Sequence, residues 1–125
     1  MNKIILGFLI VLVASPVFAL SNTEVRSNIQ SFIDTQEFPQ KIDTVTTLLR
    51  METTTRGIAY TYQLSMSQDQ FSIAALNGIK LNNITNLCTN SVMNWYKSND
   101  IEMIYYYFDN MGELISLFKV NSSDC

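Results

Sequence analysis

Residues 101–120 read IEMIYYYFDNMGELISLFKV and contain the strongest structural signal in the chain. Ile101 to Phe108 is a dense run of β-forming residues, and Glu113 to Val120 is a second such run. Between them, Asp109 to Gly112 has the residue types that favour turns. The stretch therefore predicts a β-hairpin.

Two further strands are predicted upstream of this hairpin. From Ile42 to Glu52 the residues alternate with period two, and Ile58 to Met66 alternates in the same way. Thr53 to Gly57 suits a turn, so the two segments predict a second antiparallel hairpin. The residues expected on one face are Val45, Thr47, Leu49 and Met51 in the first strand and Ile58, Tyr60, Tyr62, Leu64 and Met66 in the second.

A first helix is predicted near the N-terminus. It follows the capping candidates Ser21 to Thr23 and must end before Pro39. Its apolar residues recur at helical spacing and form one stripe, made of Val25, Ile29, Phe32 and Ile33.

Two more helices are predicted between the hairpins. Ser67 to Gln70 has the spacing of a capping box, where the second helix should begin, and regularity should be lost at Gly78 to Asn83. The residues expected to face inward from this helix are Phe71, Ala74, Ala75 and Ile79. The third helix is predicted on the stripe Ile84, Leu87, Cys88, Ser91, Val92 and Trp95.

The predicted order is helix, two strands, two helices, two strands. Hairpins and helices that do not alternate singly are typical of an α+β fold. We therefore expect a four-stranded antiparallel sheet with the helices on one face. No repeat, linker or low-complexity segment divides residues 20–125, so they should form a single small domain.

The N-terminus has the order of a secretory signal peptide. A positive charge precedes an apolar run from Ile4 to Val13, and the small residues of a cleavage site end at Ala19. Residues 1–19 are therefore predicted to be removed, which would leave no stable membrane anchor. The alternative is an uncleaved anchor, because Ile4 to Leu20 is nearly long enough to span a bilayer, but Pro16 disfavours a continuous helix.

The two cysteines of the chain are Cys88 and Cys125. In an exported protein such a pair is more typical of a disulfide than of reactive thiols. The bond would tie the tail beyond the last strand to the first half of the third predicted helix, with Cys88 facing the core. Closing this loop should stabilise the fold by about 3–4 kcal/mol.

The composition argues against most kinds of catalytic site. The chain has no histidine, which removes the usual base near neutral pH and the Ser-His and Cys-His nucleophiles. Two cysteines without histidine are too few for a structural zinc site, and no glycine-rich phosphate loop occurs. Paired carboxylates could hydrolyse glycosides, but most candidates lie at polar strand positions or turns: Glu52, Glu102, Asp109, Glu113 and Asp124. We therefore expect no enzyme activity, no metal and no cofactor.

The aromatic run Tyr105-Tyr106-Tyr107-Phe108, together with Tyr60 and Tyr62, is the candidate partner surface. Alternation sends the two odd-numbered tyrosines of the run to one face of the strand and the other two residues to the opposite face, so both faces are aromatic. One face must pack under the helices, whereas the other could present tyrosine to a partner. The alternative, which we favour, is that the run packs against cross-strand neighbours such as Tyr60 and Tyr62.

The last third of the chain resembles a pattern found in small uncharacterised exported proteins of Gram-negative bacteria. It consists of a helix cysteine, a tyrosine-rich hairpin with a D-x-x-G turn and a terminal Asp-Cys, here Leu87-Cys88, Ile104 to Asp109, Gly112 and Asp124-Cys125. The α+β order and the single disulfide are also similar to the AspS-type pilotins, which escort outer-membrane secretins of type II secretion. The resemblance implies this fold and an exported location.

These features indicate two classes of function. The first is a non-enzymatic, periplasmic or secreted accessory protein that binds a protein partner in envelope or secretion assembly. The alternative is a small inhibitor or immunity protein that blocks an enzyme with a protruding loop such as Asp109 to Gly112. The formal net charge of −3 at pH 7 argues against nucleic acid or an anionic membrane as the partner.

Overall fold

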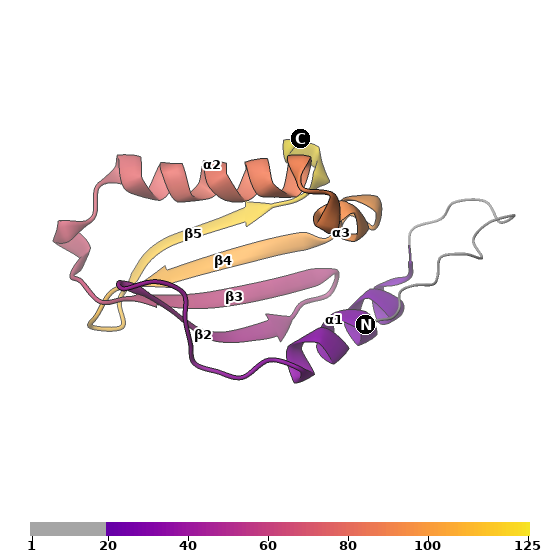
Figure 1. Cartoon of the computed structure of the whole chain (residues 1–125), viewed down its shortest axis with the longest axis horizontal. Coiled ribbons are helices and arrows are strands. Elements are labelled where there is room, and N and C mark those ends of the chain that lie inside the picture. Colours follow the sequence, from indigo (N-terminus) through magenta and orange to yellow (C-terminus); the bar gives the residue numbers. More distant parts are fainter. Residues whose placement is uncertain (1–19) are drawn as a thin grey trace, which may run out of the picture.

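Three helices and a five-stranded sheet form the part of the protein that the computed structural model describes, residues 20–125 (Figure 1). The predicted signal peptide, residues 1–19, lies outside the described residues. The helices and strands are α1 (Asn22–Asp34), β1 (Gln40–Lys41), β2 (Thr46–Thr53), β3 (Gly57–Leu64), α2 (Ile73–Thr89), α3 (Asn94–Ser98), β4 (Glu102–Phe108) and β5 (Leu114–Val120). Three short 3₁₀ turns complete the chain: η2 (Gln68–Gln70), η3 (Ser91–Met93) and η4 (Ser122–Asp124).

The sheet is mixed, with the strands in the order β1-β2-β3-β4-β5. The α+β class and both predicted hairpins are confirmed, because β2 pairs with β3 and β4 pairs with β5 in antiparallel fashion. The prediction of four antiparallel strands is wrong, since β3 and β4 are parallel and β1 adds a fifth strand. The chain between β3 and β4 contains α2 and returns to the starting end of β3, which is the connection that parallel neighbours need.

Helices α1 and α2 pack on the same face of the sheet, as predicted. Helix α1 contacts β2 and β3, whereas α2 contacts β5, so the two helices lie along opposite sides of that face (Figure 1). Side chains from both helices and from β3, β4 and β5 form one core. Its buried residues are Val25, Ile29, Ile33, Ile58, Leu64, Leu87, Ile101, Met103, Tyr105, Tyr107, Phe118 and Val120. We call this side of the sheet the core face and the opposite side the outer face.

The predicted stripe of α1 is confirmed in three of its four positions, because Phe32 is 42% exposed at the rim of the core. The helix begins with a capping box in which the Ser21 side chain accepts a hydrogen bond from the Glu24 amide at 3.2 Å. The Glu24 carboxylate accepts a hydrogen bond from the Ser21 amide at 3.0 Å. These two bonds satisfy backbone donors that the first turn would leave free.

One long helix replaces the two that were predicted between the hairpins. The Ser67–Gln70 capping box lies at the start of η2, and α2 begins instead after Ser72, whose side chain accepts a hydrogen bond from the Ala75 amide at 3.0 Å. Helix α2 then runs without interruption through residues 78–83. It ends at Thr89, because the capping residue Asn90 has an extended backbone, so Trp95 belongs to the separate helix α3. The expectation that Ala74 and Ala75 face inward is also wrong, because both are exposed.

A β-bulge changes which side chains of β2 reach the core. The register of β2 on β3 shifts between Leu48 and Arg50. Because a bulge inserts one extra residue, the period-two pattern is displaced by one position there. Leu48, 3% exposed, is therefore buried in place of the predicted Leu49. Met51, beyond the bulge, packs against the core.

Asp109 holds the turn between β4 and β5. Its side chain is buried, and Oδ1 accepts hydrogen bonds from the amides of Met111 at 2.8 Å and Glu113 at 2.9 Å. The Asp109 amide donates to the Glu113 carbonyl at 2.8 Å. Gly112 adopts φ 80°, a left-handed conformation that favours glycine. The acidic group of this loop is therefore used to close the turn and does not project from it.

Replacing Asp109 with alanine should lower the free energy of unfolding by about 1–3 kcal/mol, because two partly buried amides lose their acceptor. Asp109→Asn keeps an oxygen at the same position and should cost much less. Urea denaturation followed by circular dichroism measures both variants. Equal losses in the two variants would contradict this role, because they would point to the carboxylate charge and not to hydrogen-bond acceptance.

Candidate protein-binding surface

The core face carries a row of stacked aromatic rings across three strands. The parallel register of β3 and β4 places Tyr60 beside Tyr105 and Tyr62 beside Tyr107. The ring centroids of these pairs are 5.0 and 4.8 Å apart, with interplanar angles of 14° and 10°. Phe118 of β5 continues the row, with its centroid 4.9 Å from that of Tyr105. Tyrosines become neighbours here because both strands carry a Tyr-x-Tyr spacing and the register aligns the two.

Burial raises the pKa values of the tyrosine hydroxyl groups in this row. Desolvation raises the pKa of Tyr62 to about 12, and it raises the pKa values of Tyr60, Tyr105 and Tyr107 as well. Tyr105 and Tyr107 are only 6% and 5% exposed. Tyrosine is uncharged at neutral pH in any case, and the raised pKa values report how thoroughly these rings are buried. The favoured sequence interpretation, cross-strand packing with Tyr60 and Tyr62, describes this face.

An alkaline titration should reveal this burial. In the unfolded chain tyrosine loses its proton near pH 10, but in the folded protein Tyr62 retains it to about pH 12. Above pH 10 the unfolded state therefore binds fewer protons than the folded state, so the free energy of unfolding falls as the pH rises. We expect delayed tyrosinate absorbance that appears together with loss of the fold. Ionisation of every tyrosine near pH 10 with the fold intact would contradict this packing.

The outer face exposes a second set of aromatic and aliphatic side chains. Tyr106 pairs with Leu117, and Phe108 pairs with Leu114, across β4 and β5. The two leucines are each 48% exposed, while the two aromatic residues are half-buried. Within residues 20–125 both long helices pack on the core face, so no helix covers this set. We call these four residues the outer apolar patch.

A shallow hollow of about 340 Å³ adjoins the outer apolar patch. Tyr106 and Phe108 form one wall, and residues from β2, its turn and β3 form the rest, namely Arg50, Glu52, Thr53, Thr54, Ala59 and Thr61. The register explains this arrangement, because Arg50 pairs with Thr61 and Thr61 pairs with Tyr106 across the sheet. Thr61 is 3% exposed because it lies between two larger side chains, those of Arg50 and Tyr106.

The charges around the outer apolar patch are paired with one another. Arg50 Nε lies 3.6 Å from Glu52 Oε1 on β2, and Lys119 Nζ lies 3.9 Å from Glu102 Oε2 across β4 and β5. All four side chains are more than one-third exposed, so these pairs add little to stability. Within these four side chains the positive and negative charges cancel.

The sheet separates the six aromatic residues that the sequence suggested as a partner surface. Tyr60, Tyr62, Tyr105 and Tyr107 lie together on the core face, whereas Tyr106 and Phe108 lie on the outer face. Period-two alternation predicts this division within β4. Leu114 and Leu117 were missed, because strict alternation puts residues three apart on opposite faces, and only the register shift of β5 at Tyr107/Phe108 brings both to the outer face.

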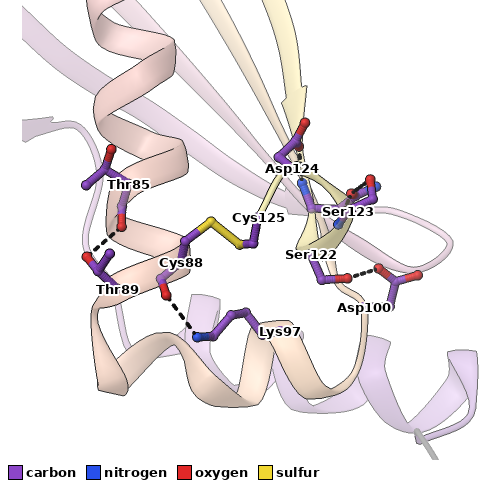
Figure 2. Close-up of a disulfide and its surroundings, with 10 residues drawn as sticks. Thr85, Cys88, Thr89, Lys97, Asp100, Ser122, Ser123, Asp124 and Cys125 are labelled. Atoms are coloured by element: carbon purple, nitrogen blue, oxygen red, sulfur yellow. Dashed lines mark hydrogen bonds between the residues drawn. A yellow bond between two sulfur atoms is a disulfide. The ribbon is translucent and has the colours of Figure 1, made fainter.

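The predicted disulfide is confirmed between Cys88 and Cys125, whose Cα atoms are 5.4 Å apart (Figure 2). Cys88 lies in the last turn of α2, and not in the first half of a third helix as predicted. Its side chain is half-buried and meets a cysteine that directly follows η4. Lys97 Nζ donates a hydrogen bond to the Cys88 carbonyl at 3.1 Å, so α3 is tied to the same place. The disulfide therefore joins the end of α2 to the segment that follows β5.

Two negative findings concern residues 20–125 alone. No three side chains among His, Cys, Asp and Glu are grouped so that they could hold a metal ion. None of the helices there is long and apolar enough to cross a bilayer.

The fold is similar to that of two type II secretion pilotins. The pilotin EpsS from the Vibrio vulnificus type 2 secretion system matches with a TM-score of 0.64 and 8% identity, over 83% of this chain and 90% of EpsS. The pilotin AspS from Vibrio cholerae matches with a TM-score of 0.62 and 13% identity, over 83% of this chain and 94% of AspS. The predicted likeness to AspS-type pilotins is therefore confirmed at the level of the fold.

A third solved structure also has this fold. It is a protein of Pseudomonas aeruginosa that is thought to be secreted, with a TM-score of 0.71 and 8% identity, over 86% of this chain and 98% of that protein. No protein-family model and no curated protein sequence matches the chain. At these identities the comparisons establish the fold alone.

Proposed function

We propose that this chain is a non-enzymatic, exported accessory protein that binds a protein partner through the outer apolar patch, in secretion or envelope assembly. The observation that carries the proposal is the exposure of Leu114 and Leu117 beside Tyr106 and Phe108, on a sheet face that no helix of residues 20–125 covers. A solvated sheet face ordinarily carries polar residues, and a contiguous apolar area on it is typical of an interaction site.

The chemistry of the patch indicates the kind of surface it binds. Tyr106 combines a large contact area with a polar hydroxyl, which makes tyrosine common among the residues that dominate binding energy. The charged rim is already paired, so a charged partner would gain little from it. The partner should therefore present an apolar, uncharged segment. This chemistry and the acidic balance of the chain both disfavour nucleic acid and an anionic membrane.

An exported location is supported by two features. The disulfide between Cys88 and Cys125 is of a kind that persists in oxidising compartments such as the bacterial periplasm. The fold is shared with two type 2 secretion pilotins and with a protein thought to be secreted. We place the mature protein in the periplasm or outside the cell, after removal of residues 1–19.

The patch can be tested with Tyr106→Ser and Leu117→Ser, singly and together. Crosslinking in periplasmic extracts should identify a component of an envelope or secretion assembly, and binding is then measured with that purified partner. Each substitution should weaken binding by about 10-fold or more, because truncating a dominant buried anchor costs about 2 kcal/mol or more and each 1.4 kcal/mol is a factor of about ten in affinity.

The matched control is Leu81→Ser, which removes an equally large side chain that is 61% exposed on α2. It should leave binding unchanged. If Leu81→Ser weakens binding while the patch variants do not, the partner binds elsewhere and the proposed surface is wrong. A captured hydrolase that the protein inhibits would favour the inhibitor alternative. In that case the exposed tip of the β4–β5 turn, where Met111 is 79% exposed, should control inhibition.

A further inference from the structure

Leu20, the first described residue, is held by hydrogen bonds from two distant parts of the chain. Its backbone nitrogen donates to Asn99 Oδ1 at 2.9 Å. Its carbonyl accepts a bond from Arg56 Nη1 at 2.6 Å. The side chain of Leu20 packs against the core. Ends of domains usually have few such contacts, so this end is tied down to an unusual degree.

The two side chains that hold Leu20 are themselves fixed. Asn99 is 7% exposed and its Nδ2 donates to the Trp95 carbonyl at 3.0 Å, which leaves Oδ1 directed at the Leu20 nitrogen. Arg56 Nη2 donates to the Asn99 carbonyl at 2.7 Å. Arg56 Nη1 also donates to Asn22 Oδ1 at 3.0 Å. The β2–β3 turn and the segment between α3 and β4 therefore form one rigid cradle.

Leu20, the residue that this cradle holds, directly follows the predicted cleavage site after Ala19. We infer that Asn99 and Arg56 form a binding site for the N-terminal residue of the processed protein, which we call the N-terminal seat. Hydrolysis of the Ala19–Leu20 peptide bond consumes one water, leaves a carboxylate on Ala19 and frees an amino group on Leu20. Once protonated, that group is a stronger donor to Asn99 Oδ1 than the amide it replaces.

The N-terminal seat has two consequences for the exported protein. A peptidase must bind the backbone around residue 20, and the N–H and carbonyl of Leu20 are occupied while they are bonded to Asn99 and Arg56. Cleavage therefore precedes docking of Leu20. After docking, the terminal residue is shielded from exopeptidases, because releasing it requires local opening of this end of the domain.

Leucine aminopeptidase, which removes an N-terminal leucine, provides a direct test. The full chain is exported to the periplasm, purified and weighed by mass spectrometry, and the mature mass should begin at Leu20. The purified protein is then incubated with the peptidase, and released leucine is measured. Arg56→Gln should speed this release by about tenfold or more, because it removes charged hydrogen bonds that hold the residue.

Two controls keep the test decisive. Arg26→Gln changes an exposed arginine of α1 and should leave the rate unchanged. Insertion of a serine between Ala19 and Leu20 leaves the cradle intact, so a broad-specificity aminopeptidase should remove the serine and then stop at Leu20. A mature mass beginning at another residue would overturn the inference. So would release of Leu20 from the wild type as fast as from Arg56→Gln, or digestion of the insertion variant past Leu20 without a pause.

Discussion

Replacing Gly57 with alanine should lower the free energy of unfolding by about 3 kcal/mol or more. Gly57 begins β3 and pairs with Glu102, which begins the parallel strand β4. A Cβ atom at this position would lie 2.7 Å from the Glu102 carbonyl carbon and closer still to its oxygen. These are backbone atoms and cannot rotate aside, so the two strands would have to separate where their pairing begins.

Gly78 offers a matched control with the opposite expected sign. It lies inside α2, and a Cβ there would meet nothing within 4 Å. Gly78→Ala should therefore raise the free energy of unfolding by about 0.5–1 kcal/mol, because alanine loses less backbone freedom in a helix. Urea denaturation of both variants is the measurement. An unchanged midpoint for Gly57→Ala would contradict the close approach of β3 and β4.

Removal of the disulfide is the second large effect that we expect. The double variant Cys88→Ser, Cys125→Ser should lose about 3–4 kcal/mol of stability. The bond closes a loop between residues 37 apart in sequence, and opening it restores conformational freedom to the unfolded chain. In the folded state it joins the end of α2 to the tail beyond β5, so this tail should fray first.

Reductant provides the control for this prediction. Denaturation of the wild type with a thiol reductant should reproduce the stability of the double variant. The double variant itself should not respond to the reductant. A wild-type midpoint that is the same with and without reductant would show that the bond contributes little to the fold. Binding assays of the outer apolar patch should be made on oxidised protein, because β5 carries Leu114 and Leu117.

Several features of the candidate site could be predicted from local patterns. Alternation in the strands separates Tyr106 and Phe108 from Tyr105 and Tyr107, since successive side chains must point to opposite faces. It also places Tyr60 and Tyr62 on one face of β3. What alternation cannot reveal is that β3 is the second neighbour of β4, on which the stacking of Tyr60 on Tyr105 depends. The pairing of Tyr106 with Leu117 depends on the register shift inside the predicted β4–β5 hairpin.

Local physics was sufficient for the α+β class, the two hairpins, the stripe of α1 and the pairing of Cys88 with Cys125. Each depends on residues close in sequence or, for the cysteines, on there being two of them in an exported chain. Packing between distant segments decided the remaining features. These are the parallel pairing of β3 with β4, the two-residue strand β1, the bulge in β2 and the uninterrupted α2. Backbone hydrogen bonds can form with any strand in reach, so the partner is chosen by which arrangement buries the core and leaves no clash, as at Gly57 beside Glu102.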